Sequence, residues 1–280
     1  MSRGILYIAT GEEHLDRAIG SAEITSRSVD VPISIVTHRE VEQNGVFDEV
    51  IVDEEPQRDF VDKPRNLPKT PYSKTLFLDA DAYVISDINE LWELLDYYDM
   101  AMAVDPNEGV LRFENKGDKL SEELPESLPE FNTGVILFNK SIIESLCQEW
   151  VDNYSDSVLN DQSAFRKTLL NMDLDFMSLS NNYNTFIGFP TQLCGEAKIV
   201  HDFFDYRDEV ENIPEIVNAS DDIRMLYFNR RKLHAINSTC GKITQYVGNS
   251  LLSVKRAKNI VEDEGFKTLV SKFKRKFSSS

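Results

Sequence analysis

Short apolar runs alternate with amphipathic stretches through the first part of the chain. The runs at residues 5–10, 33–37 and 100–104 are typical of strands that are buried on both faces of a sheet. Residues 12–26, between the first two runs, carry apolar side chains at helical spacing. Strands that alternate with helices form parallel sheets with right-handed crossovers, so this pattern predicts an α/β fold.

The apolar run at 75–78 leads directly into two carboxylates, Asp79 and Asp81. If the strand continues through them, both side chains point to the same face and repel each other unless a cation lies between them. Mg²⁺ and Mn²⁺ prefer oxygen ligands, and open α/β sheets bind ligands beyond the carboxyl ends of their strands. The segment therefore predicts a metal site that holds a phosphate-bearing ligand. The alternative is a pair of solvated turn residues.

Composition narrows the class of protein. The chain has 280 residues, of which 41% are hydrophobic, which is enough for a sizeable core. The formal net charge of −18 disfavours nucleic acid as a partner and fits a halophile-like protein of a high-salt cytoplasm. The three cysteines form no Cys-x-x-Cys pair, which favours a reducing, cytoplasmic location. No window approaches the roughly 18 apolar residues of a membrane span.

Three later segments carry polar residues suited to ligand binding. Residues 132–134, Asn-Thr-Gly, precede a strongly apolar strand, and the glycine allows close approach of a ligand. Asp161 and Gln162 begin a helix, where they either cap it or face a ligand. His201 ends a short strand and is either a third metal ligand or a structural histidine.

Two irregular stretches and a basic tail complete the chain. In the proline-rich segment 54–72, Lys63 or Arg65 either reaches a diphosphate or is solvated, and the polar stretch 105–130 is a candidate lid. From Lys255 onward eight Lys and Arg residues stand against three Asp and Glu residues. We expect a catalytic domain at 1–222 and a helical, basic extension at 223–280. The tail either packs on the body or rests on an anionic membrane surface.

In their order and spacing these segments resemble the nucleotide-sugar glycosyltransferases of the GT-A fold, family 8-like group. The matching segments are 71–81 with its Asp-x-Asp, 131–138 with Phe-Asn-Thr-Gly-Val, Asp161-Gln162, Asn182-Tyr-Asn184, and His201 at the end of Ile-Val-His. The resemblance covers residues 4 to 205. It implies a Rossmann-like, mostly parallel sheet flanked by helices, with a helical C-terminal tail.

The resemblance also implies an activity in glycan biosynthesis. A sugar would pass from a nucleotide-diphospho-sugar to an acceptor hydroxyl with retention of configuration, and Mn²⁺ or Mg²⁺ would be held by Asp79, Asp81 and His201. The catalytic residues implied are Asp161, Gln162 and Asn132. The donor-binding residues implied are Thr10, Gly11, His14, Lys63, Arg65, Asp79, Ala80, Asp81, Asn132, Thr133, Gly134, Asp161 and Gln162.

The resemblance favours a UDP-sugar donor, with a GDP-sugar as the alternative, and a glycan or lipid-linked acceptor. The basic tail would suit peripheral contact with the inner face of a membrane. The chain departs from the family where many members follow the histidine with a Lys-Pro-Trp motif that grips the diphosphate. Here Asp-Phe-Phe-Asp follows His201, so Lys63 or Arg65 is the expected substitute.

Two other functions remain open on the sequence. Haloacid-dehalogenase-type phosphohydrolases also carry an apolar run followed by Asp-x-Asp, but normally in the first strand and with Thr or Ser where this chain has Tyr83. A non-catalytic relative would bind a nucleotide without transferring a sugar.

Overall fold

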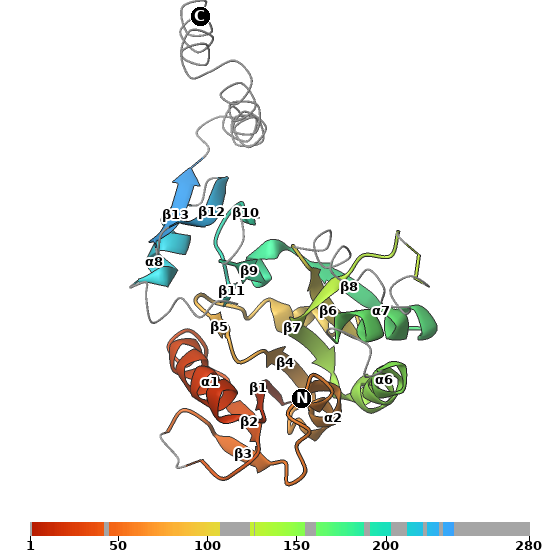
Figure 1. Cartoon of the computed structure of the whole chain (residues 1–280). Helices are drawn as coiled ribbons and strands as arrows, with labels where there is room; N and C mark the ends of the chain where they lie inside the picture. The colour runs from red at the N-terminus through yellow and green to blue at the C-terminus, as the bar shows by residue number, and fades with distance from the viewer. Residues whose placement is uncertain are drawn as a thin grey trace, which may run out of the picture. The chain divides into compact units, whose positions relative to one another are not determined.

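The structure is a computed structural model that describes residues 2–41, 45–106, 124–125, 127–154, 161–187, 191–202, 212–220, 223–229 and 232–237. Contacts divide the chain into two units, Met1–Ala235 and Ile236–Ser280. The first unit contains an α/β fold (Figure 1). Among the described residues, no helix is both long enough and apolar enough to cross a bilayer.

A seven-stranded sheet forms the centre of the first unit, with the strand order β3-β2-β1-β4-β7-β6-β8. Its strands are β1 (Arg3–Ala9), β2 (Ile33–Thr37), β3 (Glu49–Val52), β4 (Lys74–Leu78), β6 (Met100–Val104), β7 (Phe131–Asn139) and β8 (Phe176–Leu179). Neighbours pair in parallel except at β7, which runs antiparallel to both β4 and β6. The sheet is therefore mostly parallel, as the sequence predicted.

The reversed direction of β7 decides which residues meet at the ligand edge. In the β4–β7 ladder Leu78 pairs with Val135, and the backbone N–H of Asp79 donates to the Gly134 carbonyl at 2.8 Å. The start of β7 consequently lies beside the segment that follows β4. A parallel strand in this position would have placed its other end there.

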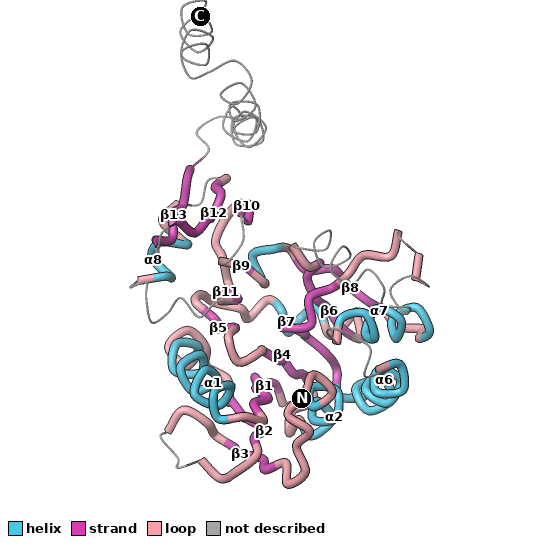
Figure 2. Tube along the Cα trace, in the orientation of Figure 1, coloured by secondary structure: helices cyan, strands magenta, loops and turns pink. Residues whose placement is uncertain are grey.

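Helices cover both faces of this sheet (Figure 2). Side chains alternate along each strand, so one set packs against α1 (Glu12–Thr25) and α3 (Leu91–Leu94), and the other against α6 (Lys140–Asn153) and α7 (Gln162–Asn171). The fully buried Trp150 of α6 packs on Phe165 of α7 and donates its indole N–H to the Asp161 carbonyl at 3.1 Å. This contact fixes the start of α7.

Two three-stranded sheets, in the orders β5-β11-β9 and β10-β12-β13, are built from strands after β8 together with β5, which lies between β4 and β6 in the chain. Their strands are β5 (Ala82–Val84), β9 (Thr185–Phe186), β10 (Thr191–Leu193), β11 (Ile199–His201), β12 (Arg224–Asn229) and β13 (Lys232–Asn237). A separate apolar cluster joins them to the short helix α8 (Ile213–Val217). In β11 His201 pairs with Ala82 of β5, which places it next to Asp81.

Two expectations from the sequence differ from the structure. Asp79 and Asp81 lie in a turn after β4 rather than in the strand, with the N–H of Ala82 donating to the Asp79 carbonyl at 2.9 Å. Residues 224–229 and 232–237, expected within a helical extension, are strands, because β10 provides an antiparallel partner for β12. The basic tail and most of the candidate lid lie outside the described residues.

Candidate active site

The turn after β4 and the end of β11 bring three ligand-type side chains together. One ligand atom from each of Asp79, Asp81 and His201 lies within 4.8 Å of the other two, and among the described residues this is the one such group. Nε2 of His201 is 3.3 Å from Oδ1 of Asp81. His201 is almost fully buried, and its ring packs on Phe186 at 4.3 Å between centroids. Two carboxylates and an imidazole are a suitable ligand set for Mn²⁺ or Mg²⁺.

In this group charged neighbours and burial have opposing effects on the pKa values. Burial alone would raise the pKa of Asp81, but the charge and hydrogen bond of His201 lower it to about 2. Burial would likewise lower the pKa of His201, and Asp81 raises it instead. Burial raises the pKa of Asp79, with the charge of Lys63 opposing and that of Asp81 adding to the effect. Each carboxylate therefore has a positive neighbour that favours its ionised form, His201 for Asp81 and Lys63 for Asp79.

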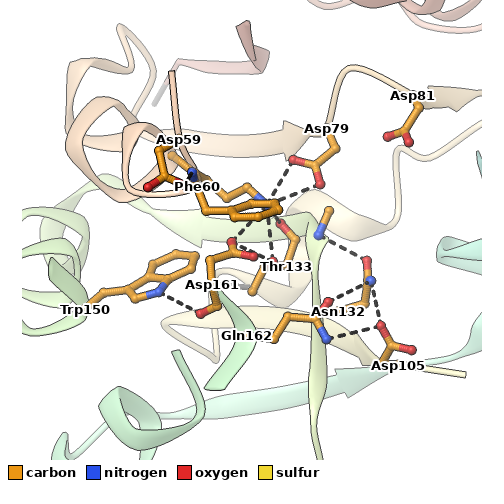
Figure 3. Close-up of polar contacts among 12 residues, drawn as sticks. Asp59, Phe60, Asp79, Asp81, Asp105, Asn132, Thr133, Trp150, Asp161 and Gln162 are labelled. Carbon is orange, nitrogen blue, oxygen red and sulfur yellow. Dashed lines mark hydrogen bonds and ion pairs between the residues drawn. The ribbon is translucent and has the colours of Figure 1, made fainter. Parts of the chain in front are cut away.

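Lys63 joins this group to the start of α7. It comes from α2 (Asp62–Asn66), and its Nζ lies 3.1 Å from both Oδ1 of Asp79 and Oδ2 of Asp161. Nζ also donates to the hydroxyl and the carbonyl of Thr133, each at 3.2 Å. Burial would lower the pKa of Lys63, but Asp161 and Asp79 outweigh burial and raise it. In Figure 3 Asp79, Thr133 and Asp161 converge on this point.

A second polar group surrounds Gln162. Its Nε2 donates to Oδ2 of Asp105 and to Oε1 of Glu130, each at 3.3 Å. Nδ2 of Asn132 donates to the same Asp105 oxygen at 2.8 Å and to Oε1 of Gln162 at 3.3 Å (Figure 3). All four side chains are buried. The catalytic candidates Asn132 and Gln162 therefore hold each other in place.

The other donor-binding residues expected from the sequence lie in different parts of the fold. The Thr10 side chain contacts α2, because its hydroxyl donates to Oδ2 of Asp62 at 2.7 Å. Gly11 and His14 lie at the start of α1, where His14 is exposed. Ala80 is buried in the turn between the two aspartates. Arg65 is exposed two residues beyond Lys63 on the same helix, so it points away from the Asp79–Asp161 group.

Three residues of the site were given no role by the sequence. Asp105 directly follows β6 at the ligand edge of the sheet, and that position could have identified it. Glu130 immediately precedes β7, and Asn184 lies in a turn before β9. Glu130 has no local pattern that distinguishes it from other polar loop residues, whereas Asn184 belongs to the family-like Asn182-Tyr-Asn184 segment but had no role assigned.

Gly134 provides the space in which the metal-ligand candidates meet. A Cβ at this position would overlap Cε1 of His201 and lie 2.9 Å from Oδ2 of Asp79. We expect Gly134→Ala to displace one or both ligands and to weaken Mn²⁺ binding at least about tenfold, at a cost of about 1–3 kcal/mol in the free energy of unfolding.

Calorimetric titration of Mn²⁺ and chemical denaturation would measure both effects. Gly11→Ala is the matched control for metal binding, because its nearest neighbour would be Cδ2 of His14 at an ordinary 3.7 Å. Unchanged Mn²⁺ affinity in Gly134→Ala would contradict the prediction.

Comparison with known proteins supports the fold and the likeness to a glycosyltransferase family. A sequence model of the family described as "Glycosyl transferase family 8" matches residues 66–203, which include Asp79, Asp161 and His201. No curated protein matches the chain in sequence.

Solved structures that match the fold include two with a TM-score above 0.5. One is the galactosyltransferase LgtC in complex with donor and acceptor sugar analogs, with 16% identity and a TM-score of 0.52 over 75% of this chain and 90% of that one. The other is the apo form of the glycosyltransferase GlyE of Streptococcus pneumoniae TIGR4, with 19% identity and a TM-score of 0.51 over 72% of this chain. The match covers only 54% of GlyE. The phosphohydrolase alternative finds no support in these matches.

Proposed function

We propose that this chain, a family 8-like glycosyltransferase of the GT-A fold, transfers a sugar from a nucleotide-diphospho-sugar to an acceptor hydroxyl in a metal-dependent reaction. The observation that carries the proposal is the juxtaposition of Asp79, Asp81 and His201 with the Lys63–Asp161 pair. This arrangement offers a divalent-cation site beside the ammonium group of Lys63 and a cluster of polar side chains around Gln162. A diphosphate and the sugar attached to it need these three environments side by side.

Mn²⁺ or Mg²⁺ fits the proposed site, because its ligand set is two carboxylates and one imidazole that Gly134 leaves room to approach each other. When bound, the cation would supply Lewis-acid stabilisation of the negative charge on the leaving nucleoside diphosphate. Asp79, Asp81 and His201 would hold it. Neighbouring side chains hold two of these ligands: Phe186 packs on His201, and Lys63 pairs with Asp79.

The other site residues have separate proposed roles. Lys63, which pairs with Asp79 and Asp161, would neutralise a diphosphate oxygen, and this contact would replace the missing Lys-Pro-Trp motif. Asp161, Gln162 and Asn132 would orient the donor sugar with hydrogen bonds to its hydroxyls. Thr10, beside α2, remains a proposed contact for the nucleotide.

Finer features of the reaction rest on the family resemblance. We propose retention of the anomeric configuration, a UDP-sugar in preference to a GDP-sugar, and a glycan or lipid-linked acceptor. A cytoplasmic location and contact of the basic tail with a membrane are proposed from composition and from the Lys and Arg residues after Lys255. None of these features is inferred from the geometry of the metal site.

The first experiment is calorimetric binding of UDP and of GDP, each with and without Mn²⁺. We expect one nucleotide to bind at least tenfold more tightly with Mn²⁺, and that nucleotide narrows the choice of donor. The titrations need both low- and high-salt buffers, because a net charge of −18 destabilises the compact state when salt does not screen it. Absence of metal-dependent binding to the folded protein in either buffer would refute the proposal.

A further inference from the structure

A chain of side-chain amides connects Gln162 to His201 through the buried interior of the site. Gln162 contacts Asn132, and Oδ1 of Asn132 accepts a hydrogen bond from Nδ2 of Asn184 at 2.9 Å. Oδ1 of Asn184 then lies 3.0 Å from Nδ1 of His201. Asn132, Asn184 and His201 are each at most 5% exposed. Water therefore does not replace any of these three side chains as a hydrogen-bond partner.

The backbone fixes the orientation of the first amide. The N–H of Gly134 donates to Oδ1 of Asn132 at 3.0 Å, and an N–H group can only donate. On the opposite side Nδ2 of Asn132 faces a carboxylate oxygen of Asp105 at 2.8 Å. A flipped Asn132 amide would place two donors against each other and two acceptors against each other. The oxygen of Asn132 must therefore point toward Gly134 and Asn184.

The orientation of the Asn132 amide determines how the Asn184 amide is oriented and which nitrogen of His201 carries a proton. Because Oδ1 of Asn132 accepts, Asn184 presents its NH₂ to it and turns its own oxygen toward His201. An amide oxygen only accepts, so Nδ1 of His201 carries a proton. The nitrogen left for a metal is Nε2, which faces Asp81 at 3.3 Å.

We propose that Asn184 is a positioning residue that fixes the Nδ1–H tautomer of His201 and thereby makes Nε2 the metal-binding nitrogen. The inference rests on the proposed metal site. A hydrogen bond to the second ring nitrogen of a ligating histidine fixes both the tautomer and the ring orientation, and its loss typically costs 10- to 100-fold in metal affinity. Packing of Phe186 on the imidazole restricts the ring but cannot select a tautomer.

The test compares Mn²⁺ binding by wild type, Asn184→Ala and Asn184→Asp. Asn184→Ala removes the acceptor, so we expect about 10- to 100-fold weaker Mn²⁺ binding by calorimetry. Asn184→Asp keeps an oxygen for the Nδ1 proton and should recover part of this loss. Asn182→Ala is the matched control, because Asn182 lies in the same 3₁₀ turn but donates to the carbonyls of Cys194 and Glu196. Its Mn²⁺ affinity should equal that of wild type.

A long-range ¹H–¹⁵N spectrum of the metal-free protein gives a readout that a merely structural role would not change. We expect Nδ1 of His201 to carry a proton in wild type and Asn184→Asp, whether or not Nε2 also donates to Asp81, and Nδ1 to be partly unprotonated in Asn184→Ala. An unprotonated Nδ1 in wild type would overturn the inference, as would wild-type Mn²⁺ affinity in folded Asn184→Ala. Failure of wild type to bind Mn²⁺ would instead refute the proposed metal site, which separates the two failures.

Discussion

Asp81→Asn should lower kcat/KM for sugar transfer about 10³-fold while leaving the fold intact. The substitution removes a carboxylate from the proposed cation site and keeps the shape of the side chain. Stabilisation of a leaving group by a bound cation is worth several kcal/mol, and about 4 kcal/mol corresponds to a factor of about 10³. Initial rates of donor consumption at saturating Mn²⁺, with circular dichroism to verify folding, would measure the effect.

Asp81 is a cleaner target than Asp79, because Asp79 also forms an ion pair with Lys63. Asp87→Asn is the matched control, because it makes the same chemical change at an exposed residue whose side chain accepts hydrogen bonds from Asn89. We expect wild-type activity in that control. An Asp81→Asn enzyme that retains more than a tenth of wild-type kcat/KM would show that this carboxylate does not hold an essential cation.

Lys63→Met should lower the free energy of unfolding by about 3 kcal/mol when no divalent cation is present. The substitution keeps most of the side-chain volume but leaves the carboxylates of Asp79 and Asp161 without their shared ammonium group. Removing one partner of a buried ion pair typically costs about 3–5 kcal/mol, because the charge that remains is uncompensated. Urea denaturation monitored by circular dichroism would measure the loss.

Two further variants separate this effect from a general loss of charge. Lys69→Met removes an ion pair with Asp53 from a lysine side chain that is 37% exposed, so it should cost less than about 1 kcal/mol. Asp161→Asn combined with Lys63→Met removes one of the two uncompensated charges and should regain part of the lost stability. If Lys63→Met were as stable as wild type, burial of this ion pair would not contribute to the fold.

The sequence predicted the central sheet, and for a different reason it singled out three residues that the structure brings together. Strands buried on both faces leave continuous apolar runs, which are visible without any tertiary information. Asp79, Asp81 and His201 were found as polar residues at the ends of such runs. The stated reason for the meeting of the aspartates was wrong, because a turn after β4, rather than strand alternation, brings them together.

Other parts of the site could not be predicted, because their partners are distant in sequence. Asn184 contacts Asn132, which is 52 residues away, and Glu130 contacts Gln162, which is 32 residues away. A polar residue in a loop carries no periodic signal that reveals such a partner. Likewise, the assignment of β12 as a strand depends on pairing with β10 rather than on its own sequence pattern.

The three metal-ligand candidates lie where two sheets meet. Asp79 follows β4 of the seven-stranded sheet, Asp81 precedes β5, and His201 ends β11; β5 and β11 have three residues each and pair with each other. So short a ladder has few backbone hydrogen bonds with which to resist local opening. A cation bound across the two sheets would act as a removable cross-link between them, so that opening of the small sheet requires its release. The cation concentration around the protein would then set how often the small sheet opens, and with it how readily proteases cut there.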